Sequence, residues 1–292
     1  MATDRPADPR IPALEAIRRK LAVASIRMTT AAASGHPSTC LSCSHLLTAL
    51  YFGGVLRIDP ARPSAPDRDR FVLSKGHAAP ILYAALAEAG VLPWDELMAL
   101  RTIGSRLEGH PNMRRVPLVE ASTGSLGQGL SIGVGMALAG RLADSDRRVW
   151  VLLGDGELDE GQVWEAAMAA AKYGLDGLVA IVDRNGYQQM GDADAVMPTG
   201  PLAAKWSAFG WRVREIDGHD WPSVLGALDA AGERSGQPTV IVAATQKGHG
   251  VRQMLDDPGN KFHGVPLKPD EAERAIAEIL SAPMPAGASA EG

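Results

Sequence analysis

The sequence is poor in cysteine and contains no long apolar segment. Its only two cysteines among 292 residues are Cys40 and Cys43, which leaves a zinc site two ligands short. We expect both to be small packed side chains on one helix face, with a redox pair as the alternative. No apolar run approaches the roughly 20 residues of a membrane span, and the first ten residues (MATDRPADPR) lack a hydrophobic signal core. A cytoplasmic protein without a membrane partner is therefore expected.

The chain also lacks an excess of positive charge. Its formal net charge is −5, which gives no reason to expect nucleic acid or an anionic membrane surface as a partner. With 292 residues and 46% hydrophobic composition, it is large enough to bury a complete core. We find no linker and no internal repeat. We therefore predict one domain over residues 1–281 and a flexible tail over residues 282–292, which are rich in Ala, Pro and Gly.

What the chain does contain is a set of short, continuously apolar segments. Residues 149–153 (VWVLL) and 178–182 (LVAIV) are typical of strands in a parallel sheet that is covered on both faces. Residues 160–173 between them are rich in alanine and lack proline, as expected of a crossover helix. The predicted fold class is α/β, a doubly wound, mainly parallel sheet with helices on both faces. Further helices are predicted over residues 12–34, 41–55, 126–142, 221–233 and 269–280, and further strands over 70–73, 211–216 and 239–244.

Polar residues follow the predicted strands. Asp155 lies in a Gly-Asp-Gly segment after one strand, Asp183 to Asn185 follow the next, and Asp217 and Lys247 follow the last two. Ligands of open parallel sheets collect at this edge, and glycines allow the backbone to approach a phosphate closely. A carboxylate, an amide oxygen and the Tyr187 carbonyl would suit Mg²⁺, or Ca²⁺ in a slightly wider cage. Ordinary turns at strand ends are the alternative, because Gly, Asp and Asn are common turn residues.

Beyond this edge, the chain resembles the N-terminal half of transketolase, a thiamine-diphosphate enzyme. Several motifs occur in that family's order and at roughly its spacing, and together they cover residues from about 12 to 280. The resemblance implies the thiamine-diphosphate-binding fold, and specifically its diphosphate-binding domain. The matching segments are residues 34–37 (SGHP), 67–77 (DRDRFVLSKGH), 108–111 (EGHP), 122–129 (STGSLGQG), 154–156 (GDG) and 262–264 (FHG).

The resemblance also implies a role for each matching position. Asp155, Asn185 and the Tyr187 carbonyl would hold the metal ion. The cofactor would be thiamine diphosphate, and the positions implied to contact it are His77, Gly124, Leu126, Gly156, Glu160, Asn185 and His263. The implied catalytic residues are His36, His77, His110 and His263, because imidazole can donate or accept a proton near neutrality. Glu160 would also lie at the subunit contact that links two active sites.

We expect different roles for the other three histidines. His45 falls in an apolar helical run and is expected to be a packed side chain. His219 lies between a strand and a helix, where we expect capping or turn structure. His249 stands in a Lys-Gly-His-Gly segment where transketolase-like chains usually carry a second basic residue, so its role stays open.

The activity implied by the resemblance is transfer of a two-carbon ketol unit from a 2-ketose, expected to be a sugar phosphate, to an aldose. Transketolase-like chains continue for two further domains, and one of them supplies the glutamate that activates the cofactor. We therefore expect the N-terminal subunit of a split transketolase. It would be inactive until joined by a C-terminal subunit in a heterotetramer with two copies of each chain. A shortened form of a longer chain is the alternative.

Other functions are weighed against this one. The chain could belong to another thiamine-diphosphate enzyme, such as a 1-deoxyxylulose-phosphate synthase or the α subunit of a 2-oxo acid dehydrogenase. The dehydrogenase is disfavoured because residues 183–186 (DRNG) lack paired asparagines. A non-catalytic regulatory subunit would be expected to lose the four loop histidines, and all four are present. A nicotinamide-dependent dehydrogenase is weaker again, since no Gly-x-Gly-x-x-Gly follows a strand.

Overall fold

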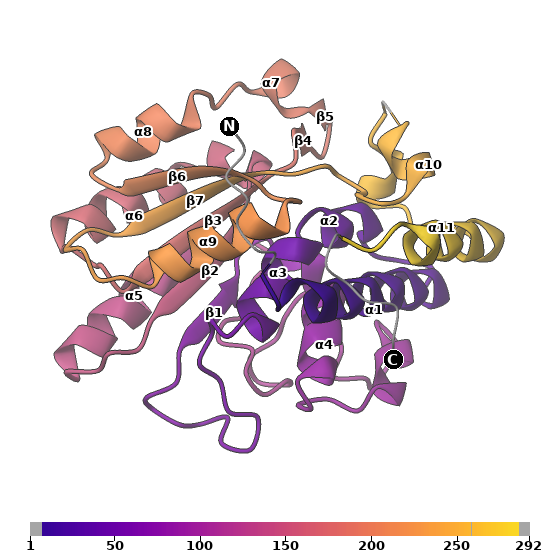
Figure 1. Cartoon of the computed structure of the whole chain (residues 1–292), viewed down its shortest axis with the longest axis horizontal. Coiled ribbons are helices and arrows are strands. Elements are labelled where there is room, and N and C mark those ends of the chain that lie inside the picture. The colour runs from indigo at the N-terminus through magenta and orange to yellow at the C-terminus, as the bar shows by residue number, and fades with distance from the viewer. Residues whose placement is uncertain (1–7, 258, 286–292) are drawn as a thin grey trace.

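The computed structural model describes residues 8–257 and 259–285 and has a five-stranded sheet at its centre (Figure 1). All paired strands of this sheet are parallel, in the order β1-β2-β3-β7-β6. Because each strand returns to the same edge through a crossover, the predicted doubly wound α/β fold is confirmed. The strands are β1 (Arg70–Leu73), β2 (Val149–Gly154), β3 (Leu178–Arg184), β6 (Arg212–Asp217) and β7 (Thr239–Ala244).

Helices cover both faces of the sheet, which explains why its central strands are continuously apolar. Trp150 and Leu152 point into the core formed with α1, α3, α4 and α9, whereas Val151 and Leu153 point into the core formed with α5, α6 and α8. Successive strand residues face opposite sides, so both halves of the alternation must be apolar here. The helices are α1 (Ile11–Ala31), α3 (Ser44–Phe52), α4 (Ala79–Glu88), α5 (Gln128–Leu142), α6 (Gly161–Lys172), α8 (Leu202–Ala208) and α9 (Trp221–Ala231).

A third, smaller core joins the two ends of the described chain. Helix α11 (Pro269–Ser281) packs on α1, and Ile276 and Ile279 bury their side chains against Ile26 there. Figure 1 shows α1 and α11 lying side by side next to α2 (Pro37–Ser42). Other short strands and α-helices are β4 (Tyr187–Gln188), β5 (Gly191–Asp192), α7 (Ala193–Val196) and α10 (Arg252–Leu255).

The structure differs from the predicted elements most clearly after the first histidine loop. The helix predicted over residues 41–55 overlaps the end of α2 and the whole of α3, which are separate helices because the backbone at Cys43 leaves the helical region with φ −92° and ψ 9°. Cys40 and Cys43 are free and fully buried, as expected of packed side chains. The Cys43 thiol donates to the Thr39 carbonyl at 3.2 Å, which satisfies its hydrogen-bonding group inside the core.

Helix α4 was not predicted at all. Nearly all of its residues are buried and apolar, so it carries no polar stripe from which a helical period could be recognised. None of the described helices is long and apolar enough to span a membrane. Of the predicted tail, residues 286–292 lie outside the described residues, and residues 282–285 follow α11 without forming a helix or strand.

Candidate active site at the carboxyl edge of the sheet

The parallel register brings the predicted polar residues to one edge of the sheet. Gly154 pairs with Asp183 across β2 and β3, and Asp183 pairs with Ala243 across β3 and β7. A cavity of about 480 Å³ opens there. It is lined by nearly all of the predicted site residues, namely His36, His77, Gly124, Leu126, Asp155, Gly156, Glu160, Asn185, Tyr187 and His263.

The oxygen donors predicted for a metal lie together at the base of this cavity. The buried Asp155 carboxylate accepts the Gly156 N–H at 2.9 Å and the Gly186 N–H at 2.6 Å. The Asn185 side-chain oxygen accepts the Tyr187 N–H at 3.2 Å. Burial and the neighbouring Asp183 raise the pKa of Asp155 to about 6. A hard divalent cation would reverse this shift, because it stabilises the ionised carboxylate, so these donors fit Mg²⁺.

Two glycines leave space that side chains would fill. A Cβ at Gly156 would lie 2.6 Å from the Cβ of Gln188. Gly124 has φ +139°, and a Cβ there would lie 2.8 Å from the His110 ring. Each position must therefore stay without a side chain, which keeps the backbone open toward the cavity.

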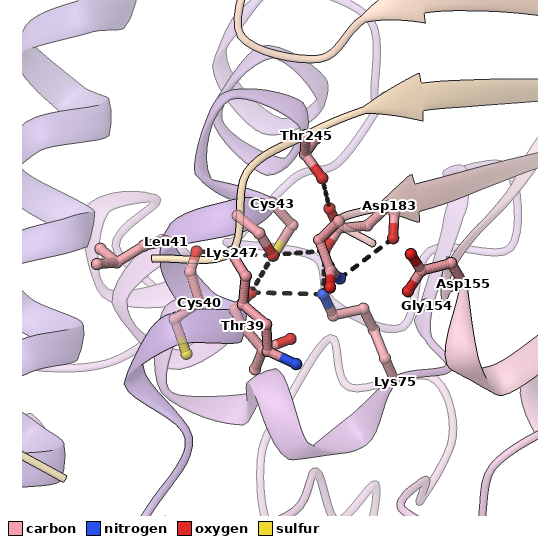
Figure 2. A network of polar contacts seen from close by, with 12 residues as sticks. Thr39, Cys40, Leu41, Cys43, Lys75, Gly154, Asp155, Asp183, Thr245 and Lys247 are labelled. Atoms are coloured by element: carbon pink, nitrogen blue, oxygen red, sulfur yellow. Dashed lines mark hydrogen bonds and ion pairs between the residues drawn. The ribbon is translucent and has the colours of Figure 1, made fainter. Parts of the chain in front are cut away.

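A buried ion pair lies next to Asp155 (Figure 2). Asp183 accepts hydrogen bonds from the Lys75 ammonium, from the Thr245 hydroxyl and, at 2.6 Å, from the Ser42 hydroxyl. Burial opposes both charges, but mutual attraction outweighs it, so the pKa of Asp183 is lowered and that of Lys75 is raised. Figure 2 shows Asp155 beside this network, which joins α2, β3 and the end of β7.

Glu157 connects three loops around the cavity. Its carboxylate accepts the Gly127 N–H at 2.9 Å, the Gly154 N–H at 3.0 Å and the Ser74 hydroxyl. The side chain is 2% exposed, and burial raises its pKa. Because an unpaired buried N–H is costly, these bonds fix the loop after β1, the start of α5 and the end of β2 relative to one another.

Three of the four predicted catalytic histidines form a tight group. The ring centroids of His36, His77 and His263 lie 5.2–5.4 Å apart. Burial lowers the pKa of His36 to about 4 and that of His263 to about 3. The pKa of His77 falls well below its usual value for the same reason. All three are therefore neutral imidazoles at neutral pH, and each has one nitrogen that can accept a proton and one that can donate.

Lys247 fixes the proton of one of these histidines. Its ammonium lies 2.8 Å from His263 Nδ1 and donates to it when charged. The proton of neutral His263 is then on Nε2. Burial lowers the pKa of Lys247 to about 8, close enough to neutrality for the lysine to lose its proton readily. His36 Nδ1, by contrast, is buried and finds no hydrogen-bond partner in the described part of the chain, which suits a group that binds a ligand.

The remaining two predicted residues lie at the rim. The His110 ring is exposed and its centroid is 6.5 Å from that of His36, while the Tyr83 hydroxyl donates to its carbonyl at 3.1 Å. Burial on one side lowers the pKa of His110. Glu160 is exposed at the mouth of the cavity. The structure therefore places His110 outside the histidine group but next to it.

Sequence reasoning assigned no site role to Lys75 or Glu157, and it placed Asp183 and Lys247 only at strand ends. Lys247 was visible because it follows a strand that points to this edge. Lys75 and Asp183 are paired across more than a hundred residues, and Glu157 bonds to segments on either side of it. No pattern within one segment could reveal these pairings.

The other three histidines form a second group, outside the cavity lining. His45 is packed, as predicted, at 4% exposure. The predicted turn at His219 is confirmed, since its N–H donates to Asp217 at 2.8 Å, but the cap of α9 is Asp220, which accepts the Ser223 N–H at 2.9 Å. The His219 side chain instead stacks on His249 at 3.6 Å between ring centroids. Burial lowers the pKa of His219 to about 4 and that of His249 to about 3.

The fold and the cavity define a cofactor-binding α/β domain whose acidic, amide and lysine groups suit a metal-bound diphosphate. The chain belongs to the family described as transketolase, thiamine diphosphate binding domain, which matches residues 13–281. The chain is therefore a thiamine-diphosphate-binding domain, and the resemblance given by its motifs is confirmed.

Two kinds of relative are found. Human transketolase is 44% identical over 278 residues, which is 95% of this chain but 44% of that protein. This chain therefore spans less than half of such long relatives. A protein of Actinobacillus succinogenes, named as one subunit of apulose-4-phosphate transketolase, is 43% identical over 265 residues, which is 91% of this chain and 94% of that protein. Among solved structures, Campylobacter jejuni transketolase superimposes with a TM-score of 0.85 at 31% identity, covering 91% of this chain and 42% of that one.

Proposed function

We propose that the chain is the N-terminal subunit of a two-chain transketolase, which transfers a two-carbon ketol unit from a 2-ketose phosphate to an aldose. The observation that carries the proposal is the cavity, where metal-type oxygen donors and neutral histidines meet. The match over 94% of a protein that is itself named as one transketolase subunit supports a separate chain for the rest of the enzyme. The partner would be a C-terminal subunit, with two copies of each chain, and the cytoplasm is the expected location.

The proposal assigns the cofactor to this chain's own groups. Asp155, Asn185 and the Tyr187 carbonyl would hold Mg²⁺, and Gly156 would let the backbone approach the diphosphate. His77, Gly124, Leu126, Glu160 and His263 would contact thiamine diphosphate elsewhere. When bound, thiamine diphosphate supplies the carbanion stabilisation that breaking a carbon–carbon bond next to a carbonyl requires.

The histidines would handle the substrate's protons. His36 and His263 would hydrogen-bond the oxygens that gain and lose protons, because both are neutral and open to the cavity. With its proton on Nε2, His263 would donate, and Lys247 would resupply that proton through Nδ1. His77 and His110 would bind donor hydroxyl groups near the reacting carbon.

The test is to mix this chain with the product of the neighbouring open reading frame, thiamine diphosphate and Mg²⁺. Ketol transfer from a ketose phosphate to an aldose phosphate is then assayed, with each chain alone as the control. Activity only in the mixture is the expected result. A complex that binds the cofactor but transfers no ketol unit from any of several ketose phosphates would instead favour the non-catalytic subunit.

A further inference from the structure

The second histidine group, His45, His219 and His249, lies at the same sheet edge but does not line the cavity. His45 comes from α3, His219 follows β6 and His249 follows β7. One donor atom from each lies within 4.8 Å of the others, and among the described residues this is the group of three such donors close enough to share an ion. We propose that His45, His219 and His249 bind a divalent transition metal ion of the zinc class, at a site separate from the Mg²⁺-type oxygen donors.

The first two ligands already have the spacing that such an ion requires. His45 Nδ1 and His219 Nδ1 lie 3.2 Å apart and are hydrogen-bonded to each other. Bonds of about 2.0–2.1 Å in tetrahedral geometry separate two ligand nitrogens by about 3.3–3.4 Å, so the ion would take the place of the proton between them with little change in their separation. The His45 ring centroid lies 5.0 Å from that of His219 and 5.1 Å from that of His249. Imidazole nitrogens favour zinc, copper, nickel and cobalt over magnesium, which separates the chemistry of the two sites.

The third ligand must move. The His219 and His249 rings are stacked, with an interplanar angle of 12°, so their lone pairs run parallel and cannot meet at one ion. The Gln246 N–H also donates to His219 Nε2 at 2.8 Å, whereas a neutral ring bound through Nδ1 carries its proton on Nε2. Metal binding therefore requires both contacts to open, and it replaces the hydrogen bond between His45 Nδ1 and His219 Nδ1 with bonds to the ion.

A single displacement relieves both constraints, because both belong to the turn at residues 246–250. His249 stands between Gly248 and Gly250, which have φ +77° and +83°. Its ring is half-buried, and its Nδ1 lies 3.4 Å from the Gln246 side-chain oxygen. We expect this turn to shift outward, so that His249 completes the ligand set while His45 and His219 stay in place.

The surroundings supply a hydrogen-bond acceptor for the first ligand and an open position for water. His45 Nε2 lies 4.0 Å from the Glu15 carboxylate, on the ring side opposite the ligand atom. A metal-bound imidazole commonly turns its other N–H toward a carboxylate, which fixes the ring and strengthens the ligand. His219 and His249 are only half-buried, so water can complete the tetrahedron, as in zinc sites with three protein ligands.

The test uses the chelator-treated full chain with excess Mg²⁺, which occupies the oxygen donors. Zn²⁺ is titrated in competition with a chromogenic chelator, and Co²⁺ is titrated by visible absorption. We expect one equivalent of Zn²⁺ and the intense absorption of tetrahedral Co²⁺. His249→Ala should weaken Zn²⁺ binding by more than about 100-fold, since loss of even a hydrogen-bond partner of a metal ligand costs about 10- to 100-fold. His263→Ala removes an equally half-buried histidine from the other group and should leave Zn²⁺ affinity unchanged.

Three outcomes would overturn the proposal. One is Zn²⁺ affinity that is equal in the wild type and in His249→Ala. Another is a loss caused equally by His263→Ala, which would place the ion in the cavity. The last is an unshifted Gln246 amide resonance on Zn²⁺ addition, since the bond from this N–H to His219 must break. Circular dichroism of His249→Ala, and the gentler His249→Gln, separates loss of a ligand from loss of the fold.

Discussion

The two histidine groups at the carboxyl edge of the sheet differ in what their rings face. His36, His77 and His263 surround a cavity and approach charged groups, with Lys247 bonded to His263. His45, His219 and His249 pack on one another and on Trp221, whose ring centroid is 4.8 Å from that of His45. Both groups are kept neutral by burial, so the lowered pKa values do not distinguish them. What distinguishes them is that only the first group lines a cavity large enough for a substrate.

A single glycine, Gly248, lies between a residue that lines the cavity and a residue of the second histidine group. Lys247 lines the cavity, whereas His249, two residues later, faces the second group. Gly248 between them has φ +77°, and a Cβ there would lie 2.3 Å from the Cβ of Met254. The reversal of direction therefore depends on a residue without a side chain.

The largest expected effect tests whether the part of the sheet edge that lines the cavity differs in function from the part that does not. Asp155 and Asp217 each lie at the end of a parallel strand, but only Asp155 lines the cavity. Asp155→Ala should abolish Mg²⁺-dependent binding of thiamine diphosphate to the two-chain protein, because it removes the only carboxylate among the three proposed ligands. Asp217→Ala should leave the affinity unchanged. Titration calorimetry measures both, and equal affinities in the two variants would remove the metal assignment.

The next effect concerns proton transfer within the cavity group. His263→Ala should slow ketol transfer by about 100-fold or more, which is the usual contribution of a positioned acid or base. Its effect on cofactor affinity should be much smaller. His263→Asn, whose amide can accept from Lys247 and donate toward the cavity, should recover part of the rate. Steady-state kinetics and cofactor titration separate the two, and equal losses in both would make His263 a structural residue.

The strands and helices that form the carboxyl edge of the sheet could be predicted from the sequence. The contacts between side chains across this edge could be predicted much less well. The segments 149–153 and 178–182 became strands because a sheet covered on both faces requires apolar residues at every position. Helix α4 was missed because burial on all sides removes the periodic pattern, and the break at Cys43 was missed because no glycine or proline marks it.

The same limit applies to the candidate site. Asp155 and Asn185 were recognisable because each follows a strand in a short polar segment. Glu157 and the pair of Lys75 with Asp183 act through contacts between distant segments, which only the folded chain reveals. The second histidine group is the clearest case, since its members come from three segments and each one alone looks like packing or a turn.

A smaller effect is expected at the carboxylate that joins the cavity loops. Glu157→Gln keeps the shape but turns an NH₂ group toward one of its backbone donors. It should lower the free energy of unfolding by about 1–3 kcal/mol, the cost of a buried donor left without an acceptor. Cofactor affinity should fall with it. Glu215→Gln, at an exposed residue of β6, should change neither. Urea unfolding and cofactor titration test this, and an unchanged affinity for Glu157→Gln would confine its role to stability.

The smallest expected effect is on the stability of this chain without its partner. It concerns how the free energy of unfolding changes with pH because of His36. The pKa of His36 is lowered to about 4 by burial and nearby positive charges, whereas an unfolded histidine titrates near about 6.5. Its contribution to stability is therefore complete above about pH 6.5 and is lost as the pH falls toward 4. Between pH 7.5 and 5 the loss should be about 1–2 kcal/mol, given that the group is only half-buried.

His36→Leu should remove this loss while abolishing ketol transfer. At pH 7.5 the variant should be at least as stable as the wild type, because the leucine also removes a buried Nδ1 that has no partner in the described chain. The difference between their urea-unfolding curves at the two pH values then reports the titration of His36, together with its effect on the neighbouring His77 and His263. Parallel loss of stability in both would mean that His36 is solvated in the free chain. The unpartnered His36 Nδ1 would then no longer distinguish the histidine group that lines the cavity from the second histidine group.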